Sequence, residues 1–110
     1  MVVFELFVQE GCVTDESRAR IVADIEAVCA EVLGMEAGPV SVSWTVIRKG
    51  FGFRGGEPST TSLVRSRIPD GYGSDVRARF LQAIAETWCN LTGATQDEVI
   101  VSARDWSWAG

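Results

Sequence analysis

Val40-Ser41-Val42-Ser43 recurs 59 residues later as Val99-Ile100-Val101-Ser102, and this repeat is the main evidence for the fold. The same shift superimposes Arg18-Ala19-Arg20 on Arg77-Ala78-Arg79, Ile25 on Ile84, and Gly34 on Gly93. A repeat that pairs helical patterns with strand patterns indicates two tandem β-α-β units. We therefore predict a single α+β domain over residues 1–110, with repeat one at 2–48 and repeat two at 60–104.

Each repeat reads as a strand, a helix and a second strand. In the first repeat we expect a strand at 2–8, a helix at 15–33 and a strand at 40–47. Thr14 caps that helix and Gly34 ends it. In the second repeat we expect a strand at about 60–67, a helix from its cap Ser74 to Gly93, and a strand at 99–103. A glycine-rich loop at 49–59 joins the repeats, and a tail with two tryptophans follows at 105–110.

The repeat also predicts how the strands assemble. Right-handed crossovers in both halves give a four-stranded sheet with both helices on one face. The strands are rich in Val, Phe, Leu and Ile, so we expect the second face to be apolar as well. Such a face is normally buried against another subunit, which predicts a closed homo-oligomer.

The composition excludes several classes of chemistry. The chain has no histidine, and its three cysteines, at positions 12, 29 and 89, show no C-x-x-C spacing. This excludes Ser-His and Cys-His catalysis and the usual zinc sites, and we expect no cofactor. No apolar run is long enough to span a membrane, and the first residues lack the basic start of a signal peptide. We therefore expect a cytoplasmic protein with no membrane partner.

The charge distribution favours a small anionic ligand. The net charge is −5, yet residues 48–79 hold seven of the ten basic side chains against three acidic ones. A local positive segment in an acidic protein suits a small anion better than a long phosphate backbone. The candidates for binding a carboxylate are Arg48, Arg54, Arg65 and Arg67. For Arg65 and Arg67, which share a strand face with Leu63, structural pairing with Glu5 is the alternative.

One motif suggests RNA binding. Lys49-Gly50-Phe51-Gly52-Phe53 matches the opening of the RNP1 pattern, in a chain of βαββαβ order. RNP1 must continue as a strand, however, and Arg54-Gly55-Gly56-Glu57-Pro58 would stop it. The acidic balance also opposes a polyanionic partner. We therefore rank an RNA-recognition module low and expect no nucleic-acid partner.

The layout as a whole resembles the tautomerase superfamily. The likeness is carried by a hydrophobic strand from residue 2, Thr14 and Gly34 at the ends of the first helix, and Phe53 followed by Gly55-Gly56. It is greatest for two-repeat members, such as the macrophage migration inhibitory factor and cis-3-chloroacrylic acid dehalogenase groups. The resemblance implies a homotrimer whose active sites lie at the start of the first strand, near subunit boundaries.

The catalytic positions implied by the resemblance are changed. The family has a proline directly after the initiator Met, where this chain has Val2, so the terminal amine belongs to Met1 or, after processing, to Val2. Cys29 stands where the dehalogenase-like group places a histidine, and Tyr72 stands where it places a substrate-binding arginine. Val2, Cys29 and Tyr72 are therefore our candidate catalytic residues. An inert core thiol is the alternative for Cys29, and Trp106 is a candidate for closing a substrate pocket.

These observations favour an isomerase- or lyase-type enzyme that acts without an N-terminal proline. We expect proton transfer, hydration or a related rearrangement of a small carboxylate- or enol-bearing substrate. The alternative is a non-catalytic trimer that binds a ligand or a partner protein.

Overall fold

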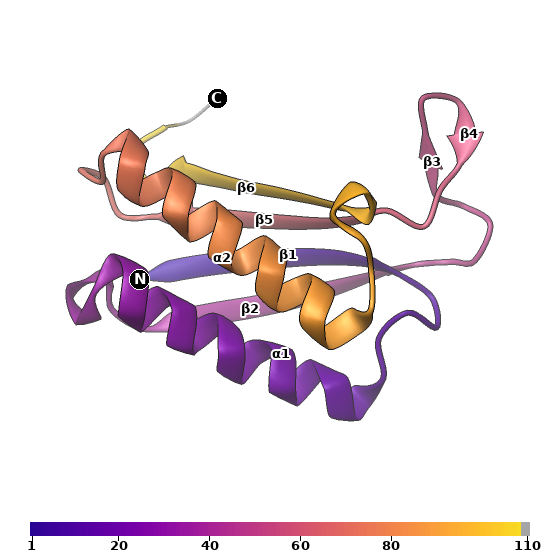
Figure 1. Ribbon diagram of the computed structural model, residues 1–110, viewed down its shortest axis with the longest axis horizontal. Coiled ribbons are helices and arrows are strands. Elements are labelled where there is room, and N and C mark those ends of the chain that lie inside the picture. The colour runs from indigo at the N-terminus through magenta and orange to yellow at the C-terminus, as the bar shows by residue number, and fades with distance from the viewer. Residues whose placement is uncertain (109–110) are drawn as a thin grey trace.

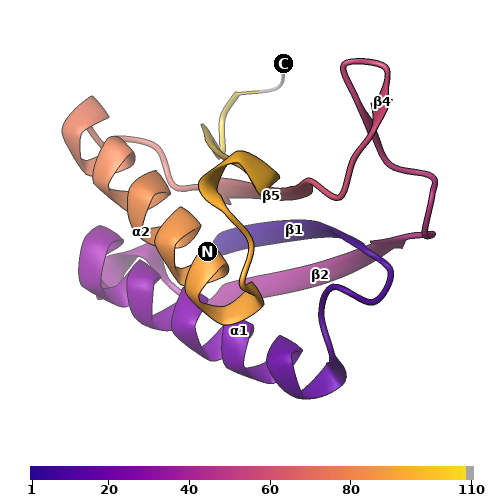
Figure 2. The same ribbon diagram turned by 45° about the vertical axis from the view of Figure 1, so that its right-hand side comes forward.

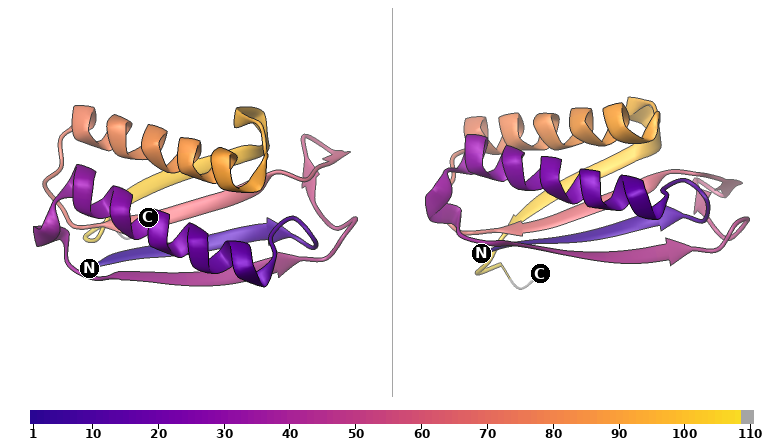
Figure 3. Two further views of the ribbon diagram at one scale, coloured as in Figure 1. Left: turned by 60° about the horizontal axis from the view of Figure 1, so that its bottom comes forward. Right: turned by 90° about the horizontal axis from the view of Figure 1, so that it is seen from below.

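The computed structural model describes residues 1–108 as one four-stranded sheet covered on one face by two helices (Figure 1). The sheet contains β1 (Val2–Gln9), β2 (Val40–Ile47), β5 (Ser62–Ile68) and β6 (Val99–Asp105), in the order β2-β1-β5-β6. The helices are α1 (Asp15–Val28) and α2 (Ser74–Thr92), and Figure 3 shows both on the same side of the sheet. The predicted α+β architecture is confirmed.

Strand pairing is the same in both halves of the chain. β1 pairs with β2 in parallel from Val2 opposite Val40, and β5 pairs with β6 in parallel from Ser62 opposite Val99. The two halves join where β1 and β5 pair antiparallel in the middle of the sheet. Because the central strands run in opposite directions, the start of β1 lies beside the end of β5.

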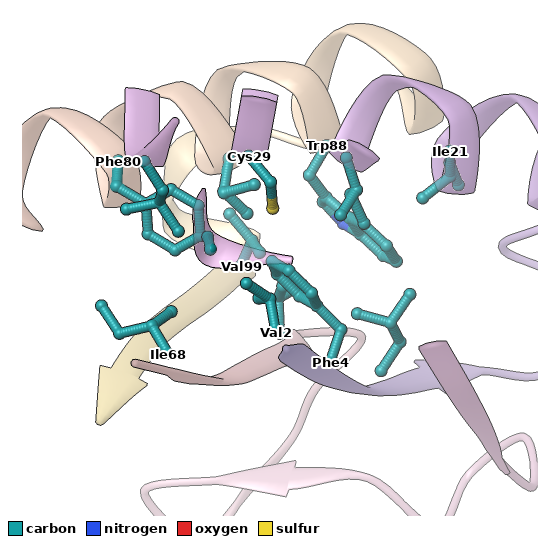
Figure 4. Packing of buried hydrophobic residues seen from close by; sticks show 14 of the residues in the cluster. Val2, Phe4, Ile21, Cys29, Ile68, Phe80, Trp88 and Val99 are labelled. Carbon is teal, nitrogen blue, oxygen red and sulfur yellow. The ribbon is translucent and has the colours of Figure 1, made fainter. Parts of the chain in front are cut away.

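The core fills the space between the sheet and the helices (Figure 4). The inward residues of β1 are buried, and the ring of Phe4 lies 6.1 Å from that of Phe80 on α2. Trp88 is buried against the same face, with its ring 6.4 Å from that of Trp44 on β2. The apolar side chains recur at helical spacing on α1 and α2, so both helices present one buried face to this layer.

The helix ends differ in detail from those predicted. Thr14 caps α1 as expected, its hydroxyl accepting from the Ser17 amide at 3.1 Å. The predicted helix at 15–33 is α-helical only to Val28 and finishes as a π-helical turn, Cys29–Leu33. The N-cap of α2 is Gly73, not Ser74, which is already the first helical residue. The last two strands also run further than predicted, to Ile68 and Asp105.

The second face of the sheet is more polar than the sequence predicts. Strand alternation puts Val3 and Phe7 there, but it also puts Glu5 there, and β2 contributes only serine and threonine opposite these three residues. β5 and β6 add Leu63, Arg65, Arg67, Ile100, Ser102 and Arg104. The alternation of Val with Ser in the repeat turns the apolar side chains of β2 towards the helices. This face is therefore a mixed surface with an excess of arginine.

The segment that matches RNP1 lies off this sheet. Lys49 to Gly52 form a loop, and Phe53 begins a two-stranded hairpin of β3 (Phe53–Arg54) and β4 (Glu57–Pro58), which projects beyond the sheet in Figure 2. Phe51 and Phe53 are 68% and 64% exposed. The central strands are instead β1 and β5, so these aromatic rings form no stacking platform on the sheet.

Within residues 1–108, neither helix combines the length and apolar character needed to cross a membrane.

Candidate functional site

The sequence-predicted site residues fall in different parts of the molecule. Five of them lie towards the end of the sheet where the chain begins: Val2, Cys29, Tyr72, Arg67 and Trp106. Arg48 and Arg54 lie towards the opposite end, where the β3–β4 hairpin projects. Arg65 lies between the two, on the second face of the sheet. The structure thus brings together five of the eight predicted residues.

The chain start is held by the loop that leads into β2. The Met1 amine donates to the Ala37 carbonyl at 2.5 Å, and the Val2 amide donates to the Pro39 carbonyl at 2.9 Å. Gly38 has a φ of +84°, and a Cβ there would stand 3.0 Å from the Met1 nitrogen. A glycine is therefore required for this close approach. Sequence reasoning missed this loop, although the Gly38-Pro39 pair directly before a strand was a signal for it.

A cavity of about 440 Å³ adjoins this loop. It is lined by Glu26, Cys29, Ala30, Gly34, Met35, Gly38, Pro39 and Val40. Gly38 and Pro39 also contact the chain start, so the cavity lies next to both nitrogens that can become the terminal amine. Met35, with 82% of its surface exposed, leaves the outer side of the cavity accessible.

The end of β6 covers the other side of the chain start. The Trp106 indole donates to the Met1 carbonyl at 2.7 Å, and Arg67 donates to the Trp106 carbonyl at 3.1 Å. The Arg67 guanidinium carbon also lies 4.5 Å from the centre of the Trp106 ring, in cation–π geometry. We use the term N-terminal edge for Met1, Val2, the 37–39 loop, Arg67 and Trp106.

Polar contacts fix the chain on both sides of Trp106. The Ser107 amide donates to Asp70 at 3.1 Å, and the hydrogen bonds from Ser107 hold the pKa of the Asp70 carboxyl below its ordinary value. Asp105 pairs with Arg77, which also donates to the Ala103 carbonyl at 2.9 Å. Trp106 is therefore held over the chain start by contacts on either side.

Arg67 has an unused hydrogen-bond donor. Its Nε is buried and has no hydrogen-bond partner among residues 1–108. In the same described range neither Arg65 nor Arg67 forms an ion pair within 4.0 Å, although Glu5 lies opposite Arg65 in the β1–β5 register. Arg65 instead lies 5.9 Å from the Phe7 ring centre. The Arg67 guanidinium is thus fixed in place but not neutralised.

Cys29 and Tyr72 are packed side chains. The Cys29 sulfur points into the core (Figure 4), the residue is 3% exposed, and burial, with a smaller contribution from Glu26, raises its pKa to about 12. The Tyr72 hydroxyl donates to the Leu33 carbonyl at 2.8 Å, where it caps the π-helical turn. Burial, with Glu36 and Cys29, also raises the Tyr72 pKa. Both groups are protonated at neutral pH, which favours a structural role.

Arg48 and Arg54 hold the glycine-rich loop. Arg48 lies 5.7 Å from the ring centre of Phe51, and Arg54 donates to the Asp97 carbonyl at 2.5 Å. These contacts join the loop to itself and to the turn before β6. Neither arginine lies near the N-terminal edge. Within residues 1–108 no three His, Cys, Asp or Glu side chains are grouped as a metal ion requires.

Comparisons with solved structures identify the fold. The native Ps01740 protein is 25% identical, with a TM-score of 0.87 and 98% of each chain covered. N1, a member of the cis-3-chloroacrylic acid dehalogenase family, has a TM-score of 0.84 at 15% identity, covering 94% of this chain and 73% of its own. The chain has a tautomerase-like fold. A fused 4-OT solved as a symmetric trimer has a TM-score of 0.83 at 16% identity, covering 94% of this chain and 84% of its own.

The likeness lies in structure more than in sequence. No model of a known protein family matches the sequence, and no curated protein does. The predicted resemblance is thus confirmed for the tautomerase-like fold, on which the N-terminal edge occupies the start of the first strand.

The Cys29 thiol predicts a loss of stability at alkaline pH. Its pKa is about 12 in the folded chain against an ordinary 9.0, so the folded state keeps this proton where the unfolded state releases it. The thiol's contribution to the free energy of unfolding is complete below pH 9 and is lost as the pH rises towards 12. Cys29→Ala should therefore flatten the fall in stability measured by urea unfolding between about pH 8 and pH 11.

Cys12→Ala is the matched control, because Cys12 is exposed. It should leave the alkaline slope unchanged. Equal slopes in the wild type and in Cys29→Ala would contradict the argument.

Proposed function

We propose that this protein is a small-molecule enzyme whose site is the N-terminal edge. The reaction is proton transfer, hydration or a related rearrangement of a carboxylate- or enol-bearing substrate, without an N-terminal proline. One observation carries the proposal: the chain start lies between a cavity of about 440 Å³ and the cluster formed by Arg67 and Trp106. Similarly folded proteins that include a fused 4-OT and a cis-3-chloroacrylic acid dehalogenase family member support it.

The terminal amine is the proton acceptor in this proposal. Removal of Met1 would leave the amine on Val2, whose nitrogen already lies 2.9 Å from the Pro39 carbonyl. The Val2 side chain is fully buried, and burial of an amine favours the neutral form that accepts protons. A retained Met1 moves the amine up to about 3.6 Å along the chain, a large displacement for a group that must meet a substrate proton.

Arg67 orients the substrate anion. Its guanidinium is held against Trp106 and forms no ion pair within residues 1–108. A guanidinium and a carboxylate form paired hydrogen bonds of defined geometry, so Arg67 would fix the acidic end of the substrate relative to the amine. The register places Arg67 opposite Val3, one residue from the proposed base.

The working assembly in this proposal is a homotrimer. One similarly folded fused 4-OT is a symmetric trimer. The apolar residues Val3, Phe7, Leu63 and Ile100 on the second face of the sheet offer contact area to another subunit, although arginines divide this area.

A non-catalytic binding trimer is the second candidate. The packing of Cys29 and Tyr72 favours it, because neither side chain is free to act as an acid or base. A non-catalytic trimer would bind its ligand with the same cavity and Arg67 but would not convert it.

Turnover should depend on which residue carries the terminal amine. Protein that starts at Val2 should convert the enol of a simple 2-oxo acid, such as phenylpyruvate, to its keto form. Protein that retains Met1 should show no rate above the buffer background, because its amine is displaced and bonded to Ala37. Intact-mass measurement assigns the terminus, and ultraviolet absorbance follows the reaction. Processed Val2→Pro protein is the positive control for the assay.

Robust turnover with Met1 still attached would overturn the assignment of the amine. Binding of the 2-oxo acid without turnover from either terminus would instead establish the non-catalytic alternative.

Arg67→Met should weaken binding of an anionic 2-oxo acid by about tenfold or more, since one charge-assisted pair contributes about 1.5–3 kcal/mol. The melting temperature should change little, because methionine keeps part of the packing against Trp106. Arg79→Met is the charge-matched control on the exposed side of α2 and should bind as the wild type does. Calorimetric titration measures the affinities. Equal weakening in both variants would show that the anion responds to the net charge of the protein and not to a direct contact with Arg67.

Assembly can be tested by light scattering, which should report a mass near three chains at micromolar concentration. A stable monomer that still shows amine-dependent turnover would remove the trimer from the proposal.

A further inference from the structure

A second binding region lies at the end of the sheet opposite the chain start. Cys12 is exposed there between two hollows of about 390 and 180 Å³, and both hollows are lined by Cys12 and Thr60. The larger is also lined by Gln9, Glu10, Lys49, Gly50, Gly52, Pro58 and Ser59, and we call it the Cys12 pocket.

A tight turn after β1 places Gln9 and Cys12 together. The Cys12 amide donates to the Gln9 carbonyl at 3.1 Å, which closes a four-residue turn. Gly11 supplies the φ of +85° that this turn requires. The first and last side chains of the turn therefore share one pocket.

The glycine-rich loop forms the opposite wall. A Cβ on Gly52 would lie 2.5 Å from Gln9 Nε2 and 2.6 Å from the Ser59 carbonyl, so the backbone at Gly52 passes directly over the Gln9 amide. This contact gives Gly52, one of the glycines in the RNP1-like motif, a structural role that does not involve RNA. Without a side chain at position 52, the loop can close the pocket against the turn.

Gln9 contributes a side-chain amide to this pocket. It is 6% exposed, and its side-chain amide forms no hydrogen bond within the described range 1–108. The amide nitrogen and oxygen remain accessible from the pocket, where a peptide group offers a matching acceptor and donor. The neighbouring hydroxyls are already engaged, since Ser59 donates to Thr61 and Thr60 to Glu98.

The rim of the pocket carries one charge of each sign. Within residues 1–108 the Lys49 ammonium forms no ion pair. Glu10 uses only Oε1, which accepts from the Lys49 backbone amide at 3.0 Å. A ligand with a carboxylate, an ammonium and a peptide group between them would match Lys49, Glu10 and Gln9 in turn.

We propose that the Cys12 pocket binds a small zwitterionic cysteinyl peptide as its disulfide, and that Cys12 takes up the peptide by thiol–disulfide exchange. The Cys12 thiolate attacks one sulfur of the peptide disulfide, a new S–S bond forms, and the original S–S bond breaks. The second peptide leaves as a thiolate and takes a proton from solvent, which balances the proton released by Cys12. This site is separate from the N-terminal edge and does not rest on the function proposed for it.

The first test is adduct formation on the full chain. With glutathione disulfide as the probe, intact-mass measurement should show one tripeptide adduct, and peptide mapping should place it on Cys12. Cys12→Ser should remove the adduct, whereas Cys89→Ser should retain it. Adduct formation at Cys89 as fast as at Cys12 would overturn the proposal.

The second test separates recognition from simple thiol exposure. The rate with glutathione disulfide relative to bis(2-hydroxyethyl) disulfide should fall about tenfold in Gln9→Met, the change expected for one lost hydrogen-bonded contact. Lys49→Met changes only the rim of the pocket, so it should not disturb the fold. It should also lower the rate with glutathione disulfide relative to the neutral disulfide. S-methylglutathione should protect wild-type Cys12 from the neutral disulfide. An unchanged ratio in Lys49→Met, or no protection, would show that Cys12 is merely exposed.

Discussion

The structure depends on the burial of β1 at the centre of the sheet. Its two edges are hydrogen-bonded to β2 and β5, and its inward side chains lie beneath both helices. The backbone groups at the start of β1 belong to the ladder that this strand forms with β2. The Val2 amide donates to Pro39 for this reason. The first residues of most domains are poorly ordered, but here the burial of β1 fixes the position of the Val2 nitrogen.

The antiparallel join between the two repeats decides what surrounds that nitrogen. Because β1 and β5 run in opposite directions, Arg67 near the end of β5 lies opposite Val3. β6 runs parallel to β5 and delivers Trp106 to the same end. The other end receives the turn after β1 and the loop after β2, which line one pocket together with the exposed Cys12. The antiparallel pairing of β1 and β5 therefore places Arg67 and Trp106 at one end of the sheet and the Cys12 pocket at the other.

The fold could be read from the sequence, whereas the site could be read only in part. Repeated Val-Ser alternation and helical spacing specify elements and faces, because both are periodic properties of the backbone. The same alternation should have predicted the polar second face, where Glu5 and the arginines lie. The lack of an ion pair at Arg65 among residues 1–108 depends on side-chain conformations, and the contact of Trp106 with Met1 depends on a distance across the fold. No local sequence pattern encodes these two features. Gly38 is the one residue whose type reflects the close approach of its loop to Met1.

In the proposed function, a terminal amine on Val2 differs from the terminal proline amine that the resemblance implies. A secondary amine that donates to the Pro39 carbonyl has no other N–H when neutral. A neutral primary amine on Val2 has two N–H groups and one lone pair. It can keep the 2.9 Å bond to Pro39 while its lone pair accepts a substrate proton. The valine side chain meanwhile fills the core position completely, so the amine is held both by the sheet ladder and by packing. Under the proposed function, a valine at this position would therefore hold the amine in place and give it one N–H donor more than a proline amine has.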